Sequence, residues 1–164
     1  MLIKLSLIFI VILAIISVTK AGAQNPFDLE KFKKTNKCQR CDLTRSDLAG
    51  LNLENANLRM AVLSHAAMTE VNLSGANLKG AILHGVNLRD SSLLKADLTG
   101  TDLRQASLAE ANMEGANLTG VILYKTDLTG ANLTGAVLKY AVLYGAVFCR
   151  TTLPSGQEDN TGCR

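Results

Sequence analysis

The sequence predicts an all-β solenoid, a rod of stacked coils whose interior is a column of leucine side chains. An apolar residue recurs at every fifth position from Leu43 to Leu153, and the register never slips. It is leucine except at Met68, Met113 and Phe148. A weaker period of twenty residues overlies the first one. The two periods predict which side chains point inward and how many repeats make one coil.

A period of five residues does not suit a helix or a flat strand. Five residues of an α-helix advance by about 500°, so successive leucines would spiral around the helix axis. In a flat strand, alternate leucines would point to opposite faces. A chain that turns through about 90° after every five residues sends all of them into one central column.

The other positions of the repeat agree with this geometry, as residues 76–80 illustrate. We number positions from the apolar residue i, which is Leu78 in this repeat. Position i−2 is mostly Ala, which fits inside, and position i−1 is mostly Asp or Asn, which hydrogen-bond turn backbone. Position i+1 is often Thr, Ser, Lys or Arg and should face water. Position i+2 is often Gly, which supplies the positive φ that some turns require.

The twenty-residue period predicts four repeats per coil. Position i−1 is apolar at Val62, Ile82, Ile122 and Val142, which are separated by multiples of twenty, and Asp102 is the one interruption. Coils of twenty residues would stack these side chains on one outer face. The 23 repeats then make about six coils and a rod roughly 28 Å long.

Residues 1–23 have the features of a cleaved secretory signal peptide. Lys4 precedes the apolar run 5–18, and Ala21, Gly22 and Ala23 form a small-residue cleavage site. The apolar run is short for a membrane span. We therefore expect export to the periplasm or the extracellular space, with no membrane span after cleavage.

Two segments flank the repeats. In residues 24–40, Asn25 suits a helix N-cap and Pro26 suits the first helical position, so we expect a short capping helix. The end of a solenoid exposes unpaired backbone groups, and a helix is a natural cover for them. At the other end, residues 154–164 form a polar tail.

The four cysteines lie in two close pairs, one at each end of the repeat tract. An even number of cysteines in an exported chain predicts disulfide bonds. The short spacings favour Cys38–Cys41 and Cys149–Cys163, although three connectivities are formally open. The C-x-x-C spacing of Cys38 and Cys41 also matches redox motifs, but those need a βαβ context. We expect a structural disulfide there, with redox catalysis and metal binding as alternatives.

The pattern A-(D/N)-L-x-x closely resembles that of the pentapeptide repeat proteins, over residues 41–153. The resemblance implies a right-handed quadrilateral β-helix with positions i and i−2 inward. Residues 148–154, together with Gly162 and Cys163, resemble the C-terminal cap of exported family members, so a disulfide-clipped cap is implied. The expected organisation is signal peptide 1–23, N-terminal cap 24–40, β-helix 41–153 and C-terminal cap 154–164.

We expect no catalytic, cofactor-binding or metal-binding site. His65 and His84 are nineteen residues apart and lack an aligned third ligand. Some family members protect topoisomerases because a strongly acidic surface makes them look like DNA. In residues 41–153, however, ten acidic residues nearly balance nine basic ones, and without Lys4 and Lys20 the whole chain has 15 basic and 14 acidic residues. This balance argues against DNA mimicry and gives no electrostatic basis for binding nucleic acid.

The outward positions near the C-terminus are unusually apolar, and an exposed apolar patch usually marks an interface. We expect self-association or docking of an unknown protein partner there, unless the tail to Cys163 folds over the patch. The residues are Ile122, Tyr124, Val137, Tyr140, Val142, Tyr144 and Val147.

The sequence thus predicts an exported, non-enzymatic protein that serves as a structural or protein-interaction scaffold. Two alternatives remain open. One is a thiol–disulfide redox protein that uses Cys38 and Cys41. The other is a DNA mimic that protects a topoisomerase.

Overall fold

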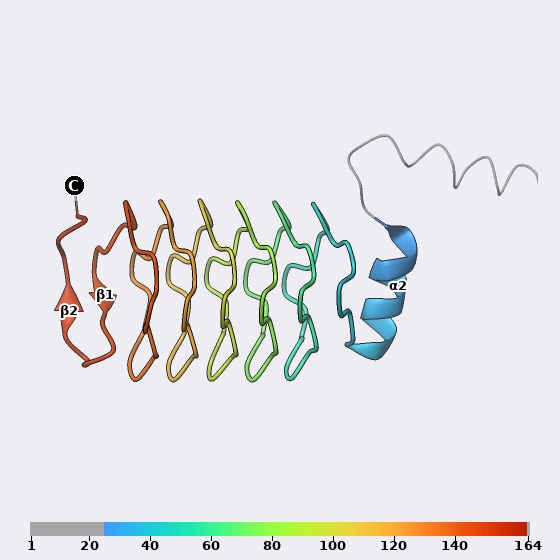
Figure 1. The fold of residues 1–164 in the computed structure, drawn as a ribbon, viewed down its shortest axis with the longest axis horizontal. Helices are drawn as coiled ribbons and strands as arrows, with labels where there is room; N and C mark the ends of the chain where they lie inside the picture. Colours follow the sequence, from blue (N-terminus) through green and yellow to red (C-terminus); the bar gives the residue numbers. More distant parts are fainter. Residues whose placement is uncertain (1–24, 164) are drawn as a thin grey trace, which may run out of the picture.

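The computed structural model describes residues 25–163, which form a rod of stacked coils with a helix at one end and a small hairpin at the other (Figure 1). The helix α2 is Pro26–Thr35, and the hairpin joins β1, Thr151–Thr152, to β2, Glu158–Asp159. The expected signal peptide, residues 1–23, lies outside the described residues. Within residues 25–163, no helix is both long and apolar enough to cross a membrane.

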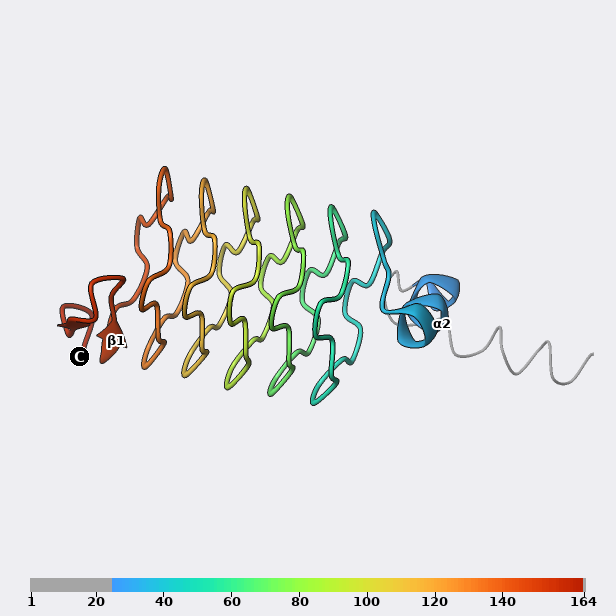
Figure 2. The same cartoon turned by 90° about the horizontal axis from the view of Figure 1, so that it is seen from below.

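Parallel pairing with a fixed offset builds the rod. Position i−1 of each repeat pairs with the residue twenty positions later, from Lys37 with Asn57 to Asn132 with Thr152. Each coil therefore has twenty residues and four faces of five, as the second period predicted. Seen from below, the coils repeat in the same orientation along the rod (Figure 2).

The repeat at residues 76–80 shows why the chain can stack in this way. The N–H of Leu78 donates to the carbonyl of Asp97 at 2.8 Å, and that of Gly80 donates to Thr99 at 2.9 Å, both one coil ahead. The N–H of Asn77 donates to Ala56, one coil behind, at 2.9 Å. Four of the five amides of this repeat donate to backbone carbonyls. The fifth, the N–H of Lys79, donates to the side-chain Oδ1 of Asn77 at 3.1 Å. Every backbone N–H of this repeat therefore has a hydrogen-bond acceptor within the rod.

Each turn combines a hydrogen bond from backbone to side chain with one residue in the left-handed backbone conformation. Every Asp or Asn at position i−1 accepts from the N–H of position i+1, at 2.9–3.3 Å. Every i+2 position from Arg40 to Arg150 has φ between 53° and 72°, and Gly occupies only ten of these 23 positions. The left-handed conformation costs other residues about 1 kcal/mol, so the ladder imposes it wherever the sequence lacks glycine.

Positions i and i−2 fill the interior, as predicted. Leucines at i from Leu43 to Leu133 are at most 4% exposed, and alanines at i−2 pack between them. Three threonines replace alanine at i−2, and each hydroxyl donates to a leucine carbonyl 23 residues earlier. They are Thr101, Thr126 and Thr151, with distances of 3.0, 2.7 and 2.8 Å. These three threonines are therefore tolerated inside because the preceding coil offers each hydroxyl an acceptor.

Helix α2 lies against the N-terminal end of the stack (Figure 1). Asn25 accepts from the N–H of Phe27 at 3.1 Å, which is the expected N-cap. Phe32 is 1% exposed and belongs to the core. The Asp28 carboxylate accepts from the N–H of Asp42 at 3.0 Å. The helix thus covers the first leucines and satisfies part of the first coil's backbone.

We expect Leu78→Ala to lower the free energy of unfolding by about 2–5 kcal/mol, because Leu78 is fully buried and a cavity would remain. Lys79→Ala, on the exposed position of the same repeat, should change it by less than about 0.5 kcal/mol. Urea unfolding followed by circular dichroism measures both. Equal effects of the two substitutions would contradict the inward assignment.

Candidate interaction surface

One face of the rod carries an apolar stripe along its length. Parallel pairing stacks Val62 on Ile82, Ile82 on Asp102, Asp102 on Ile122 and Ile122 on Val142. Ile82 and Val142 are 42% and 47% exposed. The predicted alignment of the apolar i−1 positions is therefore confirmed. We call Val62, Ile82, Ile122 and Val142 the apolar stripe.

An ion pair interrupts the stripe at Asp102. The Arg104 side chain donates to both Asp102 carboxylate oxygens, with Nε at 2.9 and 3.0 Å and one Nη at 2.6 Å. Partial burial acts to raise the pKa of Asp102, but hydrogen bonds from the Arg104 side chain and backbone, with the charges of Arg104 and His84, lower it below its ordinary value. The carboxylate is thus held ionised in the middle of an apolar face.

Two tyrosines stack beside the C-terminal part of the stripe. Tyr124 and Tyr144 are twenty residues apart at position i+1, and their ring centroids lie 5.7 Å apart at an interplanar angle of 11°. The Nζ of Lys125 lies 5.3 Å from the Tyr124 ring centroid. Tyr144 remains 75% exposed, whereas Tyr124 is half-buried. The coil period therefore builds an aromatic stack that is open on the side of Tyr144.

The seven predicted surface residues surround the C-terminal end of the rod rather than forming one flat patch. We define the last coil as residues 136–153. Val137, Val142 and Val147 occupy position i−1 on three successive faces of this coil and are 48%, 47% and 37% exposed. Tyr140 is 76% exposed, and Ile122 lies one coil earlier and is half-buried. These apolar side chains therefore surround the last coil. We call the exposed ones the collar: Val137, Tyr140, Val142, Tyr144 and Val147.

The tail does not cover this collar. The tail, which we define as residues 154–163, bonds the part of the last coil nearest to it. The N–H of Gly162 donates to the Phe148 carbonyl at 2.6 Å, and the Asn160 Oδ1 accepts from the N–H of Arg150 at 2.9 Å. The alternative expectation, that the tail folds over the patch, is wrong for Tyr140 and Tyr144, which stay three-quarters exposed.

Sequence reasoning missed one residue of this surface. Leu143 is at position i and was expected inside, but it is 37% exposed. Leu138 and Phe148, the neighbouring column residues, are half-buried. The cause is that no later coil covers them. The signal was present in the sequence, because the repeat tract stops at Leu153 and leaves its last column residues without successors.

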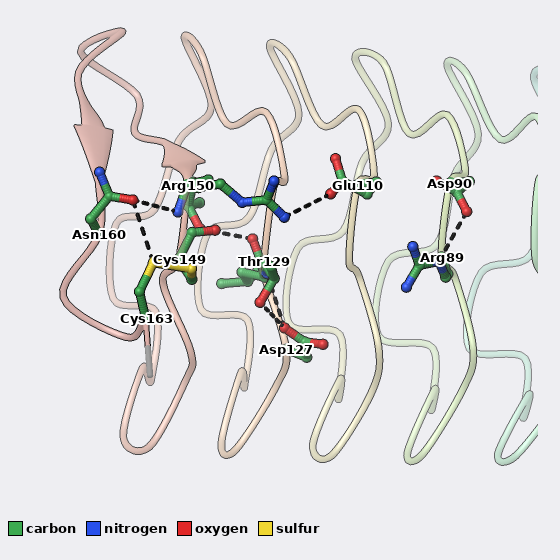
Figure 3. A network of polar contacts seen from close by, with 11 residues as sticks. Arg89, Asp90, Glu110, Asp127, Thr129, Cys149, Arg150, Asn160 and Cys163 are labelled. Carbon is green, nitrogen blue, oxygen red and sulfur yellow. Dashed lines mark hydrogen bonds and ion pairs between the residues drawn. A yellow bond between two sulfur atoms is a disulfide. The ribbon is translucent and has the colours of Figure 1, made fainter.

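The cysteines are joined in the two pairs that the short spacings favoured. Cys38 is bonded to Cys41 with their Cα atoms 5.4 Å apart, and Cys149 is bonded to Cys163 with theirs 4.7 Å apart. Cys38 and Cys41 are 4% and 8% exposed and lie beside α2. The second disulfide ties the tail to the last coil (Figure 3). Both bonds thus lie where the regular ladder ends.

His65 and His84 lie next to each other on neighbouring coils. The ring centroids of His65 and His84 are 5.3 Å apart and nearly perpendicular. Among residues 25–163, no group of three His, Cys, Asp or Glu side chains is placed to hold a metal ion.

Another face carries charges of both signs (Figure 3). Arg89 pairs with Asp90 at 3.1 Å, and Arg150 reaches Glu110, two coils away, at 3.5 Å. The coil between them has Gly130 at the equivalent position, where a Cβ would collide with the Glu110 carboxylate. This face is therefore laced by mixed charges rather than uniformly acidic.

Comparison with known proteins identifies the family. A family model described as pentapeptide repeats matches in 8 copies, over residues 37–75, 57–93, 72–108, 96–135 and 123–153. The chain belongs to the pentapeptide repeat family, and this membership implies a right-handed β-helix. Among curated protein sequences, none matches this chain significantly.

Three solved structures illustrate the likeness. A pentapeptide repeat protein from the thylakoid lumen of Arabidopsis thaliana is 31% identical, with a TM-score of 0.50, over 60% of this chain and 65% of that one. This chain thus spans just under two-thirds of the plant protein. A pentapeptide repeat protein from the cyanobacterium Cyanothece 51142 is 28% identical over 73% and 92% of the chains, with a TM-score of 0.44. QnrB1, a plasmid-mediated fluoroquinolone resistance protein, is 14% identical over 71% and 74%, with a TM-score of 0.49.

The Asp102–Arg104 pair predicts a pH-dependent contribution to stability. A carboxylate whose pKa is lowered by folding stabilises the fold above its unfolded pKa of about 3.9, and this contribution is lost as the pH falls through the lowered value. Asp102→Asn keeps the turn acceptor but removes the charge. We expect it to destabilise the rod at pH 7 by less than about 1 kcal/mol, because Arg104 is half exposed.

The measurement is urea unfolding of both proteins at pH 7 and pH 3. The difference between Asp102→Asn and the parent should shrink at pH 3. A difference of the same size at both pH values would assign the effect to something other than the ion pair.

Proposed function

We propose that this protein is an exported, non-enzymatic scaffold that docks a protein partner on the collar around its last coil. We infer a rod of about six coils, with the N-terminal cap expected at residues 24–40 and a disulfide-clipped C-terminal cap expected at residues 154–164. Members of the family are generally structural or interaction proteins rather than enzymes. Binding energy would come from the outer side chains, because the inner ones are committed to the column.

The observation that carries this proposal is the exposure of large apolar and aromatic side chains at one place. Tyr140 and Tyr144 are 76% and 75% exposed, and Val137 and Val142 beside them are nearly half exposed. Tyrosine is enriched in interface hot spots because its ring offers a large contact area with a polar tip. The Nζ of Lys139 lies 4.9 Å from the Tyr140 ring centroid, which holds a cation at the rim of the collar.

Export is supported by three separate observations. The N-terminal segment, residues 1–23, has signal-peptide composition. All four cysteines are paired in disulfides, which persist in oxidising compartments. The similar plant protein comes from the thylakoid lumen, which is also reached across a membrane. We infer a periplasmic or extracellular location.

The two alternative functions fit the surface less well. A redox role for Cys38 and Cys41 needs an accessible thiolate, whereas both residues are less than a tenth exposed. A DNA mimic needs a strongly acidic rod, whereas Arg89 pairs with Asp90 and Arg150 pairs with Glu110. The likeness to QnrB1, at 14% identity, concerns the fold and carries no argument for a shared role.

A cross-linked pull-down from the envelope or secreted fraction tests the proposal. We expect the parent to capture a protein partner, and Tyr140→Lys with Tyr144→Lys to lower its recovery roughly tenfold, as loss of two interface anchors would. Ile82→Lys is the matched control, because Ile82 is an exposed apolar residue of the stripe far from the last coil.

If Ile82→Lys abolished capture and the tyrosine variant left it unchanged, the docking site would lie on the apolar stripe instead. Equal recovery with all three proteins would refute a docking role for the collar. Circular dichroism of each variant confirms that the rod is folded before recovery is compared.

A further inference from the structure

The turns on either side of the apolar stripe carry most of the basic residues of the rod. The stripe lies on the face formed by residues 41–43 and their equivalents in the later coils. The turn before this face, 39–40, and the turn after it, 44–45, each stack on their equivalents through backbone hydrogen bonds, up to 139–140 and 144–145. We call these two stacks of turns the rims. Their basic residues are Arg40, Arg59, Lys79 and Lys139 before the stripe and Arg45, Arg104 and Lys125 after it.

The charges around the rod are segregated although their total is nearly balanced. Neither rim contains an acidic residue. The two stacks of turns on the opposite side of the rod, which begin at 49–50 and 54–55, hold five acidic residues and three basic ones. The acidic residues are Glu54, Glu70, Asp90, Glu110 and Glu114. The twenty-residue coil therefore sorts a neutral composition into a basic side and a more acidic side, which a charge count over the whole chain does not reveal.

The middle of the basic side is apolar. Ile82 and Val142 of the stripe are 42% and 47% exposed. Two carboxylates share this face with the stripe. That of Asp102 is paired with Arg104. That of Asp42 lies at the N-terminal end of the face and accepts from the N–H of Thr44 at 2.9 Å. From position 62 to position 142 the face is thus an aliphatic row, with one locally neutralised acid, between two cationic rims.

We propose that this face lies flat on a membrane surface that carries anionic headgroups. A bilayer interface offers an acyl boundary for the stripe, and it offers phosphates on both sides of the stripe for the rims. The long side chains of lysine and arginine can reach those phosphates while aliphatic side chains such as Ile82 enter the boundary. An anionic surface also attracts each cation held close to it. A soluble anionic polymer would satisfy the rims but would leave the stripe in water.

The shape of the face suits a planar surface. The coils repeat in the same orientation along the rod (Figure 2), so the stripe and both rims run side by side along its length. Tyr140 ends one rim and Tyr144 ends the other, and they are 76% and 75% exposed. Tyrosine is enriched where membranes meet water, because its ring is apolar and its hydroxyl is polar. The expected export would bring the mature chain to a membrane surface.

This inference goes beyond the proposed function, because it concerns another surface and another kind of partner. Val137 and Val147 of the collar occupy the faces before and after the stripe. Both remain free when the stripe faces a membrane. A protein docked on that part of the collar could therefore be held beside the membrane.

Co-sedimentation with lipid vesicles tests the proposal on the mature protein, purified after export with its disulfides intact. We expect binding to vesicles of phosphatidylglycerol and phosphatidylcholine in equal amounts, and at least tenfold weaker binding to phosphatidylcholine alone, roughly the effect of a few surface cations. Binding should weaken between about 0.1 M and about 1 M salt, because the Debye length falls from about 10 Å to about 3 Å.

Two lysines make a matched pair for charge reversal. Lys125 lies on a rim and Lys95 on the opposite side, and both are exposed, occupy position i+2 and have φ of 54°. Each also lies beside a glycine of the next coil, Gly145 or Gly115. Lys125→Glu should weaken binding to the anionic vesicles about tenfold or more. Lys95→Glu makes the same change in net charge and should alter binding by less than about twofold.

A second pair tests the stripe without changing the charge. Ile82→Asn should weaken vesicle binding about fivefold, because it removes apolar contact area. Val147→Asn is its control, since Val147 is also exposed at position i−1 but lies on the next face. Asparagine already occupies position i−1 in many repeats, so both variants should fold, and circular dichroism checks this.

Four outcomes would overturn the proposal. They are a parent that binds no vesicles, equal binding to both kinds of vesicle, equal losses in Lys125→Glu and Lys95→Glu, and binding to soluble polyglutamate as tight as to the anionic vesicles. A parent that fails on vesicles but captures a protein through Tyr140 and Tyr144 would leave the proposed function standing. Vesicle binding without capture of any protein would support this inference and count against the docking role of the collar.

Discussion

The structure depends on the inward turn that the chain makes after every fifth residue. From Arg40 to Arg150, every residue at i+2 adopts a left-handed backbone conformation. Where position i−1 is Asp or Asn, its side chain accepts a hydrogen bond from the turn backbone. These two devices return the chain to the same place after twenty residues, where it pairs in parallel with itself. The leucine column follows from this path, because position i then points inward at every step. Burial of about 1.5–3 kcal/mol per leucine in turn offsets the strain of the non-glycine turns.

The five-residue repeat assigns structure and recognition to different positions. Positions i and i−2 are committed to the interior, so recognition must come from the outer positions and from the two ends. Along the faces, the coil period turns single residues into rows, such as the apolar stripe and the Tyr124–Tyr144 stack. At the ends, the ladder must stop. Helix α2 covers the last unpaired backbone groups at the N-terminal end. At the C-terminal end, the disulfide-bonded tail covers only part of the last coil.

Most of the fold could be predicted from the sequence because its two periods are strict. Leu78 and Ala76 were placed inside, and Val62 was placed above Ile82, from spacing alone. The left-handed conformation at Tyr140 or Lys125 could not be predicted, since glycine is its usual marker and the ladder imposes it here. The exposure of Leu143 was also missed, because periodicity describes a repeat with neighbours on both sides. The collar residues were found from composition, but their arrangement around three faces required the coil geometry.

Hydrogen exchange of individual backbone amides tests the coil most directly. The account predicts slow exchange at positions i−1, i, i+2 and i+3 through the central coils, because these amides donate to backbone carbonyls. It predicts fast exchange at i+1, fastest at Ser64, His84 and Tyr124, where position i−1 supplies no Asp or Asn acceptor. Protection that follows this five-residue rhythm would support the twenty-residue coil. Protection with a helical or two-residue period, or equal protection at i+1, would contradict it.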